Sequence, residues 1–151
     1  AELGRIFESL ARQNRYELPS LTRAKMLLGF QYLLEHRDEH FGNGRLARNV
    51  YERSVRRLAS RLADVVPLTR ALLTTLQPED LVLEGVPETV WRCLDGDGYF
   101  FHLPCPSCGR SCRLRQTYLG CKVQCPGCKH EFEADWGEVN EPSAAPPNKG
   151  S

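Results

Sequence analysis

The residues best suited to chemistry in this sequence are four cysteines arranged as two short pairs. "CPSC" at 105–108 and "CPGC" at 125–128 give the pattern C-x2-C-x16-C-x2-C. A pair of this kind can place two thiolates on one ion, and the separation between the pairs is typical of four-cysteine zinc sites. The pattern therefore predicts that one zinc ion is bound by four residues: Cys105, Cys108, Cys125 and Cys128. Four thiolates leave no open position for water, so the predicted role of the metal is structural.

The remaining cysteines and one histidine are weaker candidates for the metal. Cys112 and Cys121 each lie three intervening residues from a ligand pair, and Cys93 lies further upstream. We interpret all three as packing residues, with the alternative that Cys112 or Cys121 replaces a ligand. His130, just after the second pair, is a weaker candidate still.

Composition and charge limit the class of protein. The chain has 151 residues, is 41% hydrophobic, and carries 20 Lys and Arg against 19 Asp and Glu, a net charge of +1. The hydrophobic fraction is enough for a folded core. Because the net charge is close to zero, a partner attracted by charge must bind at a local cluster of charged residues. No apolar run reaches the roughly 18 residues of a membrane span. Seven cysteines, an odd count, favour metal in a reducing compartment, so we expect a cytoplasmic protein. The start at Ala1 without Met indicates a piece of a longer chain.

Residues 1–84 have the apolar spacing of helices. The first stretch carries five apolar residues on one face: Leu3, Ile6, Phe7, Leu10 and Ala11. A second helix is expected to begin at Ser20, a favoured N-cap residue, and to carry a broad apolar face. A third helix is expected over 43–64 with arginines outside, and a fourth short helix follows with Pro67 in its first turn.

The pattern changes after Pro87. "TVWRCLDGDGYFFHLPC" alternates aromatic and β-branched residues about an acidic tetrapeptide that lacks the glutamate of a calcium loop, so a β-hairpin is predicted. The stretch between the cysteine pairs can form a second hairpin, with Gly120 as its turn. The predicted fold class is therefore α+β, a four-helix bundle followed by a small β zinc ribbon. The expected divisions are a helical domain, a linker with a hairpin, the ribbon and a disordered tail, at 1–84, 85–103, 104–138 and 139–151.

Two arginines stand where the helix dipole disfavours cations. "FGNGRLARN" at 41–49 opens the third helix and places Arg45 and Arg48 in its first turns, beside the positive end of the dipole. A solvated face with ion pairs accounts for the later arginines, from Arg53 to Arg61. It does not account for the first two unless an anion shares the site.

Residues 1–84 resemble the C-terminal helical lid of AAA+ ATPases of the sporulation-protein and rubisco-activase type. The likeness is carried by "FGNGRLARNVYERSVRRLASRL", with "ELGRIF" before it and "LQPEDL" after it. In that family the arginine of this element, called sensor 2, reaches the nucleotide phosphates and couples hydrolysis to lid rotation. The resemblance implies that Arg45 is the catalytic sensor arginine and contacts the nucleotide with Gly44. It gives turn-shaping, structural or inter-subunit roles to their neighbours: Gly42, Asn43, Arg48 and Asn49.

The other parts of an ATPase site do not occur in the sequence. It has no G-x-x-x-x-G-K-[ST] phosphate loop, and no apolar strand ends in the paired acids of a magnesium site. We therefore expect that the chain alone neither hydrolyses ATP nor binds it appreciably. ATP and Mg2+ would be cofactors of the full-length parent, and the resemblance implies that this parent is a homo-oligomeric ring, a hexamer, that remodels a protein substrate.

The cysteine segment resembles small zinc ribbons attached to many bacterial proteins. The matching residues are Cys105, Pro106, Cys108, Gly120, Val123, Cys125, Pro126, Cys128 and Phe132. Cys121 departs from the pattern. Such ribbons bind proteins or nucleic acids, and the fold does not decide between them. We expect recruitment of a protein client or adaptor.

A nucleic-acid-binding module is the rival interpretation. An arginine-rich helix would enter a groove, and the ribbon would bind beside it. The ribbon is locally basic through five residues, with Tyr118 available for stacking: Arg110, Arg113, Arg115, Lys122 and Lys129. A purely structural module, whose arginines only solvate its surface, is the third alternative.

Overall fold

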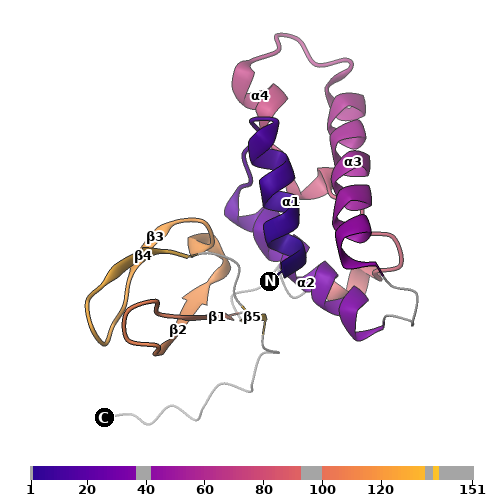
Figure 1. Ribbon diagram of the computed structural model, residues 1–151. Coiled ribbons are helices and arrows are strands. Elements are labelled where there is room, and N and C mark those ends of the chain that lie inside the picture. Colours follow the sequence, from indigo (N-terminus) through magenta and orange to yellow (C-terminus); the bar gives the residue numbers. More distant parts are fainter. Residues whose placement is uncertain (1, 37–41, 93–99, 135–137, 140–151) are drawn as a thin grey trace.

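A helical half of the chain precedes a β-rich half (Figure 1). The computed structural model describes residues 2–36, 42–92, 100–134 and 138–139. Its helices are α1 (Glu2–Gln13), α2 (Ser20–Glu35), α3 (Asn43–Leu62) and α4 (Arg70–Thr74), and its 3-10 turns are η1 (Pro78–Asp80), η2 (Glu88–Val90) and η4 (Gln116–Tyr118). Its strands are β1 (Phe100–Pro104), β2 (Ser111–Arg115), β3 (Lys122–Gln124), β4 (Glu131–Glu133) and β5 (Glu138–Val139). This order confirms the predicted α+β class. None of the described helices is long and apolar enough to cross a membrane.

Helices α1 and α3 pack against each other along their apolar faces. On α1 the buried side chains include Leu3, Phe7 and Ala11, which recur every four residues as a single helical face requires. On α3, Leu58 is buried, and the ring of Tyr51 meets the ring of Phe7 edge-on, with 5.6 Å between their centroids. Burial of one such large side chain contributes about 1.5–3 kcal/mol, so this contact is a main source of the stability of the helical half.

Helix α2 approaches the segment that follows η1 closely at Gly29, so that a side chain at this position would displace Leu83. A Cβ atom at Gly29 would lie 2.5 Å from Cδ1 of Leu83. The Nζ of Lys25 donates to the carbonyl of Pro78 at 2.9 Å and lies 4.8 Å from the ring centroid of Trp91, whose indole N–H donates to the carbonyl of Lys25 at 3.1 Å. Burial lowers the pKa of Lys25. These contacts hold η1 and η2 against α2.

An ion pair with a buried carboxylate ties the end of α3 to η1. Asp80 is fully buried, and its two carboxylate oxygens accept hydrogen bonds from Nε and Nη2 of Arg61 at 2.7 and 2.8 Å. The backbone N–H of Gln77 donates to the same carboxylate at 2.9 Å. The prediction that the later arginines of this helix form a solvated face is therefore wrong for Arg61. Its carboxylate partner lies 19 residues away, which helical periodicity does not reveal.

Each cysteine pair forms the turn of its own hairpin. Strands β1 and β2 pair antiparallel around the first cysteine pair, with Phe100 opposite Arg115 and His102 opposite Arg113. Strands β3 and β4 pair around the second, and β5 joins the other edge of β1, where Glu138 pairs with His102. The predicted hairpin between the two cysteine pairs is therefore wrong, because each C-x-x-C itself reverses the chain. Gly120, at a φ of 81°, instead follows η4 in the turn that leads to β3.

The β half packs on the helical half and shares its hydrophobic core (Figure 1). The buried side chains that it contributes to this core are Phe101, Leu103, Leu119 and Ala134. The hydroxyl of Ser20 donates to the carbonyl of Leu119 at 2.6 Å. Ser20 was expected to cap α2, but Pro19 stands at the N-cap and no side chain caps this helix. The serine binds the β half instead.

An ion pair between α1 and α2 also touches the β half. Nη2 of Arg23 lies 2.7 Å from Oε1 of Glu8, with side-chain exposures of only 11% and 12%. The guanidinium of Arg23 also lies against Gly120, where a Cβ atom would come within 2.8 Å of its Nε. The glycine is therefore required twice, for its positive φ and for this close approach.

Two other local predictions are wrong. The segment Glu88–Val90, expected to begin the first arm of a hairpin, forms η2. The turn of that hairpin, with Cys93, lies outside the described residues, and β1 pairs with β2 and β5. Helix α4 begins after Thr69, whose hydroxyl oxygen accepts from the N–H of Leu72 at 3.2 Å, so Pro67 is not in its first turn.

The buried pair of Arg61 and Asp80 gives the first testable prediction. Asp80→Ala leaves the guanidinium without its partner, and we expect the free energy of unfolding to fall by about 2–3 kcal/mol. Glu84→Ala is the matched control, because its pair with Arg53 is made by exposed side chains and contributes less than about 1 kcal/mol. Urea unfolding followed by circular dichroism of the helices measures both variants. Equal losses would contradict the assignment.

Candidate metal centre

The four predicted cysteines converge at the point where the two hairpin turns meet. Their Sγ atoms all lie within 4.8 Å of one another, with 3.6 Å between Cys105 and Cys128 and 3.7 Å between Cys108 and Cys125. The first cysteine of each pair is buried and the second is exposed. Four sulfur donors at this mutual distance can hold one metal ion, and the set of four thiolates fits zinc in tetrahedral coordination. Geometry and donor chemistry thus agree with the spacing of the sequence.

The two cysteine turns have the same backbone structure. In the first, the N–H of Cys105 donates to the carbonyl of Arg110 at 2.8 Å, and Gly109 has a φ of 73°. In the second, the N–H of Cys125 donates to the carbonyl of His130 at 2.9 Å, and Lys129 takes the equivalent left-handed position at a φ of 64°. A non-glycine residue costs about 1–2 kcal/mol in this conformation. Metal binding offsets that cost when both turns hold one ion.

The turns also prepare one thiol to bind a cation. The backbone N–H groups of Cys128 and Gly127 lower the pKa of Cys125 to about 6, so this sulfur is largely a thiolate at neutral pH. The backbone N–H of Arg110 acts in the same direction on Cys108, but the neighbouring Cys128 thiol and burial outweigh it and raise the pKa of Cys108 to about 11. A metal must therefore displace protons from part of the set, and its affinity falls as the pH is lowered.

The two other cysteines that the structure describes, Cys112 and Cys121, do not belong to this group of four. Cys112 is buried in β2 and packs in one small cluster with Cys105, Cys125 and Phe132. Cys121 is exposed, and its Sγ donates to the carbonyl of Thr117 at 3.8 Å. The interpretation of both as packing residues therefore fits Cys112 and is wrong for Cys121. The imidazole of His130 is exposed and lies outside the metal group. His130 supports the second cysteine turn only through its backbone carbonyl, which accepts from the N–H of Cys125.

Arg110 lies across the second cysteine turn, a contact that its place in the sequence does not reveal. A Cβ atom at Gly127 would lie 2.9 Å from Nη1 of Arg110. The first hairpin thus places a guanidinium on the turn of the second, which carries two of the four candidate ligands. Glycine at position 127 leaves room for this contact.

The predicted nucleotide contact lies on the helical half, at the start of α3. Gly44, Arg45, Arg48 and Asn49 are all exposed there. Gly42 stands at the N-cap without a side-chain hydrogen bond, and the first turn contains no acidic residue. Apart from its chain neighbours and the backbone of its own helix, no described atom lies within 4 Å of a Cβ atom placed at Gly44. The first turn is therefore open, with its N–H groups uncapped by a side chain.

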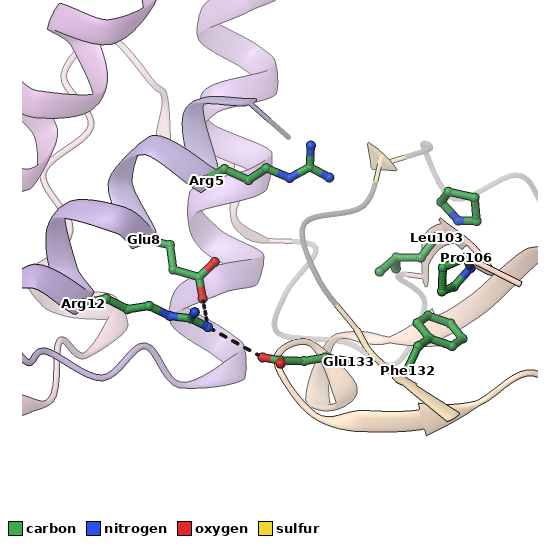
Figure 2. A pocket seen from close by; sticks show the side chains of 8 residues that line it. Arg5, Glu8, Arg12, Leu103, Pro106, Phe132 and Glu133 are labelled. Carbon is green, nitrogen blue, oxygen red and sulfur yellow. Dashed lines mark ion pairs between the residues drawn. The ribbon is translucent and has the colours of Figure 1, made fainter. Parts of the chain in front are cut away.

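A groove of about 510 Å³ separates α1 from the two cysteine hairpins (Figure 2). Its apolar floor comes from the hairpins, through Leu103, Pro104, Pro106 and Phe132. Its charged wall comes from α1, where Arg12 forms ion pairs with Glu8 at 3.1 Å and, across the groove, with Glu133 at 3.8 Å. The guanidinium of Arg5 is directed into the same space (Figure 2). The groove thus combines apolar surface with charges of both signs.

Comparison with known families identifies the helical half. The family model described as AAA lid domain matches residues 1–89, which is more than half of the chain. The chain therefore belongs to the AAA lid domain family and is a fragment of an AAA+ ATPase, as the sequence resemblance predicted. No curated protein and no solved structure matches the chain. The family match ends before β1 and does not include the cysteine hairpins.

Loss of one predicted ligand gives the second testable prediction. Metal analysis should find one zinc per wild-type chain and none in Cys105→Ser, because three thiolates hold zinc much more weakly than four. Hydrogen exchange should show lost protection in β1–β4 and retained protection in α1 and α3. Cys121→Ser, which removes an exposed thiol outside the group, should keep the metal. A wild-type chain without zinc, or a Cys105→Ser chain that retains it, would contradict the site.

Proposed function

We propose that this chain is the C-terminal part of an AAA+ ATPase in which the lid supplies a sensor arginine to ATP hydrolysis and a zinc ribbon recruits a protein client or adaptor. The lid family match over residues 1–89 carries this proposal. Under this proposal, the phosphate loop and the magnesium ligands belong to a core domain of the full-length parent protein. The parent is a homo-oligomeric ring in the cytoplasm that remodels its client.

Arg45 is the proposed sensor residue. It is exposed in the open first turn of α3, where no described acidic residue precedes it within the turn. A phosphate at this position would accept from the guanidinium and from uncapped backbone N–H groups, and the helix dipole would favour its charge. Gly44 would allow close approach of the nucleotide, since a side chain there meets no described atom of this chain.

The rival function, with α3 entering a nucleic-acid groove, is less well supported by the contacts of this helix. Arg61 is held by Asp80 at 2.7 Å, and Arg53 by Glu84 at 2.8 Å. Both cations are partly neutralised by their partners, which weakens the electrostatic attraction of this face for a polyanion.

Replacement of the sensor arginine tests the proposal in the full-length ATPase. Arg45→Ala should lower ATP turnover by about a hundredfold, as expected when one charge-stabilising donor is removed from a phosphoryl-transfer site. Arg56→Ala is the matched control. It makes the same change on the same helix about 16 Å away, given a rise of 1.5 Å per residue, and should retain turnover. Unchanged turnover in Arg45→Ala would contradict the sensor role and favour a purely structural module.

The groove between α1 and the hairpins is the proposed surface for the client or adaptor. Pro106→Glu places a carboxylate on its apolar floor and should release partners that the immobilised wild-type chain retains. Pro126→Glu is the matched control, because Pro126 occupies the equivalent position in the other cysteine turn and does not line the groove. Mass spectrometry of the retained proteins, on variants with unchanged zinc content, should show proteins lost only with Pro106→Glu. Identical sets from all three chains would contradict this assignment.

A further inference from the structure

The outward face of the first hairpin differs in composition from the rest of the β half. Because paired residues of an antiparallel ladder share one face, six residues of β1 and β2 stand together on it: Phe100, His102, Pro104, Ser111, Arg113 and Arg115. We call this set the hairpin face. The alternate residues of the same strands, such as Phe101 and Cys112, are buried. The hairpin face is therefore the side of these strands directed away from the core, and both of its arginines are exposed.

Neither arginine of the hairpin face forms an ion pair with a described side chain. Arg113 and Arg115 have no such partner within 4.0 Å, and none of the six residues of the face is acidic. Glu131 and Glu133 stand on β4 in the second hairpin, where Glu133 is opposite Lys122 and also faces Arg12, and Glu138 of β5 is opposite His102 at the other edge of β1. Opposite charges are thus paired on the second hairpin, while β1 and β2 themselves carry cations and no carboxylate.

An aromatic ring lies beside these cations. The guanidinium carbon of Arg113 is 3.5 Å from the ring centroid of Phe100, so a cation is held against the aromatic ring. Nδ1 of His102 lies 3.5 Å from the hydroxyl oxygen of Ser111 on the same face. Arg113 and Arg115 are two residues apart on β2, so they lie about 7 Å apart along the strand. An extended ligand chain that runs parallel to β2 can therefore contact both.

We propose that the hairpin face binds single-stranded nucleic acid. Phosphates would contact Arg113 and Arg115, and a base would stack on the plane formed by Arg113 and Phe100. A strand with exposed bases fits this face better than an acidic peptide, because a row of carboxylates uses the cations but not the stacked aromatic surface. The three residues proposed to bind, Phe100, Arg113 and Arg115, do not line the client groove and are distinct from the sensor arginine, so this site does not depend on the proposed function.

Fluorescence anisotropy of the zinc-loaded chain tests this site with a labelled oligothymidylate. For single strands each phosphate contact contributes about 0.7 to the slope of log affinity against log salt. Arg113→Ala/Arg115→Ala should therefore reduce that slope by about 1.4 and weaken binding at least tenfold. Arg48→Ala/Arg56→Ala, which removes two exposed arginines from α3, is the matched control and should bind as the wild type does.

The comparison of ligands separates the possible partners. A polyglutamate peptide of matched charge should bind more weakly than the oligothymidylate, and equal or tighter binding of the peptide would overturn the proposal. So would the absence of oligonucleotide binding at low salt, or an unchanged salt slope in Arg113→Ala/Arg115→Ala. Zinc content, measured on each variant, verifies that the hairpins remain folded. None of these outcomes depends on ATP turnover by the parent. The sensor role of Arg45 is tested separately, by the turnover of Arg45→Ala.

Discussion

The size of the β half is the constraint on which the rest of this structure depends. A unit of about 35 residues cannot bury enough apolar surface to fold by itself. Apart from the cysteines and Phe132, the described apolar side chains that it buries belong to the core of the helical half. Two supports replace a separate core. One is the packing against α2, and the other is the metal that the four cysteines can hold, whose binding in small zinc peptides contributes about 10–16 kcal/mol.

The polar contacts at this interface fix its orientation as well as its strength. Hydrophobic packing alone would tolerate small rotations, but the hydrogen bond from Ser20 to Leu119 crosses the interface, and the guanidinium of Arg23, held by Glu8, lies against Gly120. In the proposed function this matters mechanically, because rotation of the lid would carry the ribbon with it. Helix α3 lies on the other side of α1 from the ribbon, so nucleotide and client would bind to separate surfaces (Figure 1).

Features set by local spacing could be predicted from the sequence. The four cysteines converge because each C-x-x-C determines its own turn, and α1 follows from apolar residues at helical intervals. The lid family was recognisable from the residues around Arg45, and the family comparison confirms it. The sensor role of that arginine, the identity of the metal and the client remain predictions.

Long-range pairings could not be predicted, because they depend on which surfaces meet. Ser20 has the chemistry of an N-cap, yet its hydroxyl reaches a carbonyl 99 residues later. Arg61 looks like one of several surface arginines, yet it meets the buried Asp80. The close approach of Gly29 to Leu83 is visible only in the tertiary structure. The sequence by itself thus determined the helices, the cysteine turns and the lid family. Only the tertiary structure decided how the turns pair their strands, where the β half docks, and which arginines keep an unneutralised charge, since each of these depends on residues distant in the chain.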